Sequence, residues 1–215
     1  MEGARAHARD RVRSAPVVTA GRALSWLFVP GHRPDRFDKA VASGAHEVIV
    51  DLEDAVAPAA KISARSEVVR WLGAGGSAWV RINGVETAWY DDDVAALAGV
   101  PALRGVMVPK AERTTLLLHL RQKLPPAVGV LALIESAVGV HQAALIADTP
   151  GISGLAFGSV DFALDIDAEE TDDALLYAHA SRPRSSSTAE PACWSSSSCP
   201  RGSRTGRPPS TKPSL

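Results

Sequence analysis

The sequence is poor in cysteine, in long apolar runs and in net charge. Its two cysteines, Cys193 and Cys199, both fall in a serine-rich segment, so neither a disulfide framework nor a zinc-binding spacing is expected. No stretch approaches the roughly 18 consecutive apolar residues of a membrane-spanning helix, so no membrane segment is predicted. The formal net charge of −1 gives no electrostatic reason to expect nucleic acid or an anionic membrane as a partner. We therefore expect a cytoplasmic globular protein.

Composition divides the chain into three regions. Residues 1–21 are rich in arginine but contain Glu2 and Asp10 and lack an apolar signal core, which predicts a disordered basic leader. Residues 22–180 are expected to form the folded domain. Residues 181–215 hold eleven serines and six prolines but no valine, isoleucine or phenylalanine, so they are expected to be disordered. An authentic low-complexity tail and out-of-frame translation of a GC-rich gene both explain that composition.

Six short apolar runs in the central region are typical of buried parallel strands. Several contain three or more consecutive apolar residues instead of strict alternation, as expected for strands covered on both faces. Helix-like stretches separate them, and one of these is predicted to bury Ile62, Val69 and Leu72 on one face. The strand starts recur every 22 to 31 residues, which predicts a series of βα units. The predicted strands are residues 24–30, 46–52, 77–82, 104–109, 127–135 and 152–158.

Six βα units fit either an open doubly wound sheet or a (β/α)8 barrel that lacks its last two strands. A dinucleotide-binding sheet has a glycine-rich phosphate loop after its first strand. The corresponding loop here reads PGHRPDRF and contains only Gly31, so that fingerprint is absent. A barrel assembles its active site at the carboxyl ends of several strands, and polar residues follow most of the predicted strands here. We therefore predict a partial TIM-type α/β barrel.

The acidic end of the second predicted strand is the most informative of these polar positions. The segment VIVDLEDAVAP places Asp51, Glu53 and Asp54 directly behind a run of aliphatic residues, with no lysine or arginine among them. Unpaired carboxylates at a buried strand end are costly, so a cation is expected to face them. The residues expected at the same mouth are Pro30, Gly31, Arg33, Arg81, Asn83, Lys110, Glu135, Gly158 and Asp161.

Glu135 and Asp161 are the strongest candidates for a metal pair. Hard oxygen ligands without cysteine or a well-placed histidine suit Mg²⁺, which one or two carboxylates hold while water and substrate fill the other positions. Arg81 offers a planar fork for a substrate carboxylate. Structural alternatives remain open at this point: Glu53, Asp54 and Asp161 could cap helices, Arg81 could form a structural ion pair, and Lys110 could be a solvated loop charge.

Taken together, several segments of the central region resemble the citrate lyase β-subunit-like branch of the HpcH/HpaI aldolase superfamily. The segments are LFVPGHRPDRFDKAVASGAHEVIVDLEDAVAPAAK, VRIN, VMVPKAE, LIESAVGV and GLAFGSVDFALDI, between about residues 24 and 178. The resemblance implies a (β/α)8 barrel and Mg²⁺-dependent cleavage or formation of a carbon–carbon bond in 3-hydroxyacyl-CoA thioesters such as citryl-CoA or malyl-CoA. It also implies assembly as a homo-oligomer.

The resemblance also implies roles for individual residues. Glu135 and Asp161 match the metal carboxylates, and both Arg81 and Glu135 match residues that contact the substrate and act in catalysis. Glu53 and Asp54 match an acidic segment near the metal. Pro30, Gly31 and Lys110 lie where relatives contact the substrate or the thioester chain.

The resemblance ends where the serine-rich segment begins. Relatives continue through two more strands and a C-terminal segment, so this chain is expected to be a truncated or frame-shifted member that retains the metal half-site. Two further functions remain open. One is a 2-oxo-acid aldolase that acts on free acids, and the other is a non-catalytic subunit that associates with intact relatives.

Overall fold

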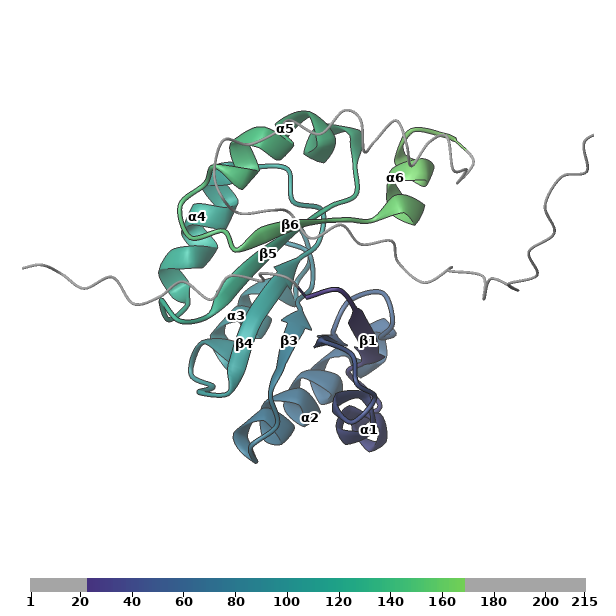
Figure 1. The fold of residues 1–215 in the computed structure, drawn as a ribbon, viewed down its shortest axis with the longest axis vertical. Helices are drawn as coiled ribbons and strands as arrows, with labels where there is room; N and C mark the ends of the chain where they lie inside the picture. The colour runs from purple at the N-terminus through teal and green to yellow at the C-terminus, as the bar shows by residue number, and fades with distance from the viewer. Residues whose placement is uncertain (1–22, 169–215) are drawn as a thin grey trace, which may run out of the picture.

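The computed structural model of the protein describes residues 23–168, which form a six-stranded parallel sheet (Figure 1). Each strand pairs with the next one in the chain, in the order β1-β2-β3-β4-β5-β6. A doubly wound sheet would reverse its strand order at a switch point, whereas a barrel adds strands sequentially. The predicted barrel-type fold is therefore confirmed for these residues. The strands are β1 (Trp26–Pro30), β2 (Glu47–Asp51), β3 (Ala78–Arg81), β4 (Leu103–Val108), β5 (Gly129–Ile134) and β6 (Gly154–Phe157).

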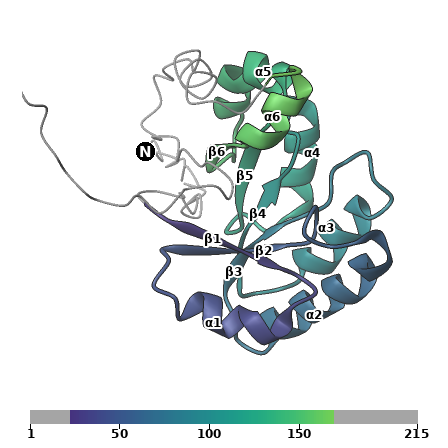
Figure 2. The same ribbon diagram turned by 90° about the vertical axis from the view of Figure 1, so that its right-hand side faces the viewer.

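Helices follow every strand and cover one face of the curled sheet, which forms half a barrel (Figures 1 and 2). Within residues 23–168, no helix is long and apolar enough to cross a membrane. The predictions for residues 1–21 and 181–215 lie outside the described residues. The helices are η1 (Pro34–Arg36), α1 (Phe37–Val41), η2 (Pro58–Ala60), α2 (Lys61–Gly73), α3 (Tyr90–Ala98), α4 (Thr114–Lys123), α5 (Ala137–Ala147) and α6 (Ser159–Asp165).

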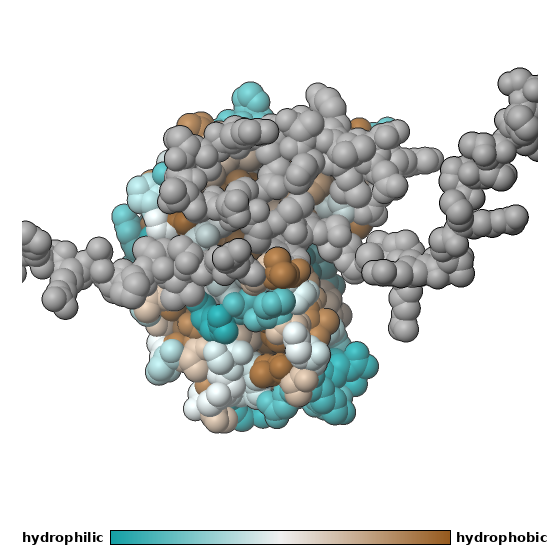
Figure 3. All heavy atoms as spheres, viewed as in Figure 1, coloured by the Kyte–Doolittle hydropathy of each residue, from teal (hydrophilic) through white to brown (hydrophobic). Residues whose placement is uncertain are grey.

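The two faces of the sheet bury different side chains because successive residues of a strand point in opposite directions. The outer face packs against the helices and forms the larger core, with Val50 and Val80 from the strands and Leu72 from α2 among its members. The inner face forms a smaller cluster of Ile49, Trp79, Met107, Leu131, Leu133 and Ala156. In the view of Figure 3, hydrophobic residues drawn in brown also reach the surface beside hydrophilic ones drawn in teal.

The buried face of α2 differs from the one predicted from the sequence. The pattern predicts Ile62 in the core, but its side chain is 67% exposed. The buried positions are Lys61, Ala64, Val68 and Leu72, which follow the helical spacing of three and four residues. The helix is therefore rotated so that a lysine, rather than the neighbouring isoleucine, points inward.

Trp79 fills the inner side of the half-barrel and requires glycine on the two following strands. A Cβ atom at Gly105 would lie 2.2 Å from the indole ring, and one at Gly129 would lie 2.5 Å from it. The ring is fully buried, packs against Trp26 at a centroid distance of 5.3 Å, and donates its Nε1–H to Glu47 at 3.2 Å. The indole therefore has little freedom to move away from a new methyl group.

We expect Gly105→Ala to lower the free energy of unfolding by about 1–3 kcal/mol, because it overpacks the contact with Trp79. Gly99→Ala is the control, because Gly99 follows α3 with φ −93° and a methyl group added there would meet no atom within 4 Å. That change is expected to be neutral or slightly stabilising. Urea denaturation of both variants measures the difference, and equal stability of the two would contradict the packing argument.

Candidate active site at the carboxyl edge of the sheet

The carboxyl ends of the parallel strands bring three of the predicted site residues into register. Pro30 at the end of β1 pairs with Asp51 at the end of β2, and Asp51 pairs with Arg81 at the end of β3. Glu135 directly follows β5, and Asp161 lies in the first turn of α6 after β6. Strands β2, β3, β5 and β6 thus contribute charged groups to one edge, and Pro30 of β1 lies beside them.

Arg81 is held by three carboxylates. Its Nε and Nη2 donate to the two oxygens of Asp51 at 2.7 and 2.6 Å, which is a bidentate pair. Its Nη1 donates to Asp54 at 3.2 Å and lies 3.0 Å from Oε2 of Glu53. The hydrogen bonds and negative charges raise the pKa of the guanidinium even though burial opposes that shift. The fork that the sequence assigned to a substrate carboxylate is thus bound to Asp51, and only the Nη1 end faces the acidic loop.

Asp51 also shapes the loop that follows β2. Its Oδ1 accepts the N–H of Glu53 at 2.8 Å, and its Oδ2 accepts the N–H of Ala55 at 3.1 Å. The side chain is therefore fully engaged in turning the backbone and binding Arg81. Asp51 is a structural member of the acidic segment, which leaves Glu53 and Asp54 as its available carboxylates.

Glu53 is a buried carboxylate with an incomplete set of partners. It is 9% exposed, and burial raises its pKa to about 7, with the charges of Asp54 and Asp51 adding to the shift and Arg81 opposing it. Its Oε2 accepts no hydrogen bond from the described residues, although Nη1 of Arg81 is close enough for an ion pair. Neither Glu53 nor Asp54 caps the following helix, because η2 has Ala57 at its N-cap with no side-chain bond. The alternative interpretation of the two acids as helix caps was wrong.

Glu135 is the most deeply buried of the candidate ligands. It is 3% exposed, and its Oε1 accepts the backbone N–H of Lys110 at 2.8 Å. Burial raises its pKa to about 8, and the charges of Glu53 and Asp161 act in the same direction, whereas the bond from Lys110 opposes the shift. A Cβ atom at Gly158 would lie 2.8 Å from Oε2, so the glycine leaves the space that this carboxylate occupies.

Lys110 connects Glu135 with Asp161. Its backbone has φ +46°, a left-handed conformation that is unusual for a residue with a side chain and that recurs at functional sites. Its Nζ lies 3.8 Å from Oδ2 of Asp161. Asp161 does not cap α6, whose N-cap is Gly158 without a side-chain bond. Lys110 therefore contacts both candidate metal ligands, Glu135 through its backbone N–H and Asp161 through its exposed ammonium.

Gly31 has a packing role at the same edge. Its N–H donates to the carbonyl oxygen of Asp51 at 2.7 Å, and a Cβ atom there would lie 2.8 Å from that oxygen. The glycine thus lets the loop after β1 lie directly on the end of β2. Arg33, expected at the mouth, is bound instead to Asp35 at 2.8 Å.

Asn83 does not face the mouth as predicted. Its N–H and Nδ2 donate to Oδ2 of Asp93 at 3.0 and 2.6 Å, and Nε of Arg65 donates to Oδ1 of the same carboxylate at 2.7 Å. Asp93 is fully buried, although it belongs to an acidic run, residues 91–93, in the first turn of α3. Sequence reasoning also missed Lys61. The sequence gives only a weak signal for Asp93 and Lys61, which is that each takes a helical position on the buried face.

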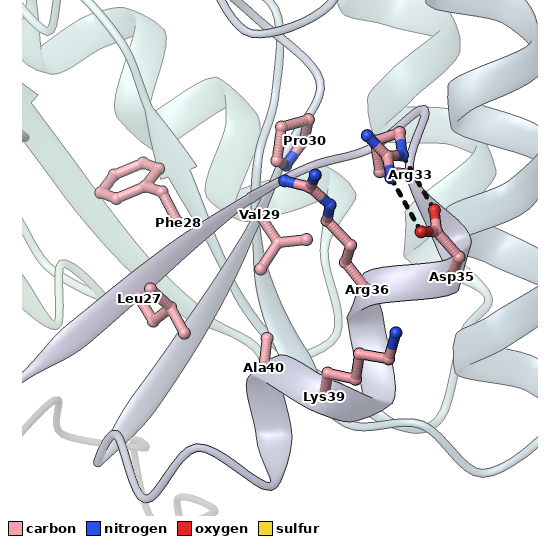
Figure 4. Close-up of a pocket in the computed structure, with 9 residues that line it drawn as sticks. All are labelled: Leu27, Phe28, Val29, Pro30, Arg33, Asp35, Arg36, Lys39 and Ala40. Atoms are coloured by element: carbon pink, nitrogen blue, oxygen red, sulfur yellow. Dashed lines mark hydrogen bonds and ion pairs between the residues drawn. The ribbon is translucent and has the colours of Figure 1, made fainter.

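One cavity among the described residues is separate from the carboxylates. It measures about 460 Å³ and lies along β1 and the residues of η1 and α1 (Figure 4). Its lining includes Pro30, Arg36 and Lys39 but none of the candidate metal ligands. Within residues 23–168, no group of three histidine, cysteine, aspartate or glutamate side chains is arranged to hold a metal ion. A pair of carboxylates completed by water is a pattern that Mg²⁺ accepts.

Comparisons with known proteins give a consistent result. The profile of the HpcH/HpaI aldolase/citrate lyase family matches residues 24–192. A (3S)-malyl-CoA thioesterase of Cereibacter sphaeroides is 36% identical over 146 residues, which cover 66% of this chain and 50% of that protein. A citrate lyase subunit beta-like protein of Mycobacterium tuberculosis is 41% identical over 136 residues, which cover 63% and 47%. The chain spans about half the length of these curated relatives.

Solved structures show the same fold. The citrate lyase beta subunit of M. tuberculosis, complexed with oxaloacetate and magnesium, matches with a TM-score of 0.63 and 33% identity over 74% of this chain and 71% of that one. The protein CitE of M. tuberculosis, in complex with magnesium, acetoacetate and coenzyme A, matches with a TM-score of 0.64 and 34% identity over 74% and 60%.

We expect Asp51→Asn to lower the free energy of unfolding by about 3 kcal/mol or more, because it leaves the charge of Arg81 without its main partner. The new amide would also direct N–H groups at the guanidinium. Asp35→Asn is the matched control, because it removes the carboxylate of another Arg–Asp pair that is exposed to solvent. Its urea midpoint should not change measurably. A similar urea midpoint for both variants would show that the Asp51–Arg81 pair contributes no more to stability than the exposed pair.

Proposed function

The chain belongs to the HpcH/HpaI aldolase/citrate lyase family, and we propose that its strand-end site serves magnesium-dependent carbon–carbon cleavage or formation in a 3-hydroxyacyl-CoA thioester. Substrates of the citryl-CoA or malyl-CoA type fit this proposal. Relatives named malyl-CoA thioesterase and malyl-CoA/β-methylmalyl-CoA lyase support the thioester class. Since the chain covers about half of such relatives, the activity is proposed for the site and not carried over from them.

The observation that carries the proposal is the buried carboxylate Glu135 next to Asp161. Burial holds the pKa of Glu135 at about 8, so the group is kept from ionising at neutral pH unless a cation compensates it. The ammonium of Lys110 is half-exposed and lies on the Asp161 side. Nearby, Oε2 of Glu53 has no hydrogen-bond donor among the described residues. A hard divalent cation would compensate Glu135 and Asp161 directly and Glu53 through a bound water, and carboxylate oxygens are the ligands that Mg²⁺ prefers.

Each residue has a defined task in this proposal. Glu135 and Asp161 would hold Mg²⁺, and Glu53 and Asp54 would orient its water ligands. The N–H of Lys110 fixes Oε1 of Glu135 and leaves Oε2 toward the site. When bound, magnesium supplies positive charge that stabilises the enolate formed as the carbon–carbon bond breaks.

The substrate would be oriented by the cations at the edge. Nη1 of Arg81 would receive a substrate carboxylate, in exchange for its contacts with Asp54 and Glu53. Pro30 and Gly31 would line the path of the thioester chain together with Lys110. Breaking the bond between C2 and C3 of the thioester would leave the electron pair on C2, while the C3 hydroxyl loses its proton to water and becomes the carbonyl of the oxo acid. A proton taken up from water at C2 would then complete the acyl-CoA product, so that no net proton is gained or lost.

A second candidate function is aldol cleavage of free 2-oxo acids at the same site. The M. tuberculosis neighbours are described in complex with magnesium and oxaloacetate or pyruvate, which are free oxo acids. A third candidate is a subunit without catalysis that associates with intact relatives. Retention of Glu135, Asp161 and Arg81 gives that role no advantage over the enzymatic ones.

We expect Mg²⁺ to bind the wild-type chain and to bind Glu135→Gln and Asp161→Asn at least about tenfold more weakly, since each change removes an anionic ligand. Asp165→Asn is the control. Asp165 lies on the same helix as Asp161, is exposed, and accepts a hydrogen bond from Ala137 that an asparagine oxygen retains. Isothermal titration calorimetry measures the affinities. Equal affinity for all four chains would remove Glu135 and Asp161 from the metal site.

We expect the chain to cleave malyl-CoA or citryl-CoA with added Mg²⁺, and to lose that activity with EDTA or with Glu135→Gln. The assay follows release of the oxo acid, with free malate, citrate and 4-hydroxy-2-oxo acids tested in parallel. Cleavage of the free 2-oxo acids alone would establish the aldolase instead. Binding of Mg²⁺ without turnover of any substrate, together with capture of a full-length family member, would establish the non-catalytic role.

A further inference from the structure

Lys61, the first residue of α2, buries its ammonium against the backbone of the acidic loop. The side chain is only 6% exposed. Its Nζ donates to the carbonyl oxygen of Leu52 at 2.8 Å and to that of Glu53 at 2.7 Å. The Nζ atom also lies 5.3 Å from the centre of the Trp89 ring. The ammonium of Lys61 therefore binds the backbone of the loop that contains Glu53.

The partners of Lys61 are unusual for a buried lysine. Burial lowers its pKa, and the charges of Asp51, Glu53 and Asp54 oppose that shift. No ion pair joins Nζ to a carboxylate within the part of the chain that the structure describes. Charge-assisted bonds to two consecutive carbonyl groups replace it. The cation thus fixes the loop backbone without occupying the carboxylate oxygens that a metal or its water would need.

One turn further along α2, Arg65 binds the next loop of the same edge. Its Nε donates to Asp93 at 2.7 Å, its Nη2 reaches the carbonyl oxygen of Trp89 at 3.4 Å, and Asp93 in turn accepts both bonds from Asn83. The Trp89 ring contacts Lys61 and its carbonyl contacts Arg65. The helix α2 therefore joins the loop after β2, which carries Glu53, to the segment after β3, the strand that ends at Arg81.

We infer that Lys61 is a positioning residue, which holds the backbone of residues 52–53 so that the Glu53 carboxylate faces the proposed magnesium ligands. The effect on magnesium rests on the proposed function. The fixing of the loop backbone rests only on the two carbonyl contacts of Lys61. The Lys61 ammonium binds backbone carbonyl groups and not the proposed metal ligands, so its effect would pass through the loop.

The first experiment measures loop order without any ligand. Lys61→Met keeps the length and apolar stem of the side chain but removes the ammonium. We expect amide hydrogen exchange of residues 52–56 to become about tenfold faster while β4 keeps its protection, because the change acts locally. Lys123→Met is the control, since Lys123 is a helical lysine whose side chain is 39% exposed and is bound to Asp91. Unchanged exchange at residues 52–56 would overturn the inference.

The second experiment links the loop to the metal. We expect Lys61→Met to weaken Mg²⁺ binding by about tenfold, as for other groups that orient a metal ligand. In a Glu53→Gln background, Lys61→Met should weaken Mg²⁺ binding little further, because Lys61 affects the metal only through the Glu53 carboxylate that this background lacks. Independent, multiplicative losses would show a merely structural lysine and overturn the inference.

Two controls keep the outcomes separate. Lys61→Arg, which retains charge and N–H donors, should recover most of the affinity, whereas a loss equal to that of Lys61→Met would contradict the role. If Lys61→Met does not fold, Lys61→Gln retains an N–H donor without the charge and enters the same comparison. A wild-type chain that binds no Mg²⁺ would refute the proposed function, and hydrogen exchange would still decide whether Lys61 holds the loop.

Discussion

The bidentate pair between Arg81 and Asp51 is the interaction on which the carboxyl edge of this sheet depends. It joins the ends of two neighbouring strands, with Nη2 and Oδ2 separated by 2.6 Å and both side chains largely buried. Asp51 uses the same two oxygens to bind the backbone N–H groups of Glu53 and Ala55. Removing either partner would leave an unpaired charge in a poorly solvated place. The turn after β2 and the ion pair therefore depend on the same carboxylate. The direction of the whole acidic loop follows from this arrangement.

The distribution of cations around that loop then decides which acids remain available. Arg81 is bound mainly to Asp51, and Lys61 is bound to backbone carbonyl groups. Glu53 and Glu135 therefore remain as buried carboxylates, and burial raises the pKa of both. Two such acids at one edge of the sheet support the proposal that a cation binds there. The solved relatives that contain magnesium are consistent with this interpretation, although the chain covers 71% of one of them and 60% of another.

Much of the fold followed from local pattern, because apolar runs and their spacing are properties of the chain itself. All six predicted strands are present within a few residues of their predicted limits, and their sequential parallel pairing agrees with the predicted barrel. The rotation of α2 was predicted wrongly at Ile62, because the apolar face of that helix is weakly marked and a lysine takes an inward position. The burial of Asp93 was not predicted, because its partners Arg65 and Asn83 come from other parts of the chain.

The sequence by itself determined which strands form, that they belong to a barrel-type α/β fold, and that carboxylates follow the ends of strands two, five and six. Those facts depend on periodicity and on the polarity of residues next to strand ends. Only the tertiary structure decided that Arg81 binds Asp51, that Lys61 lies under the acidic loop, and that Lys110 donates its N–H to Glu135. Each of these contacts joins residues from different strands, helices or connecting loops. Its existence depends on how the elements pack, and a one-dimensional pattern does not encode that packing.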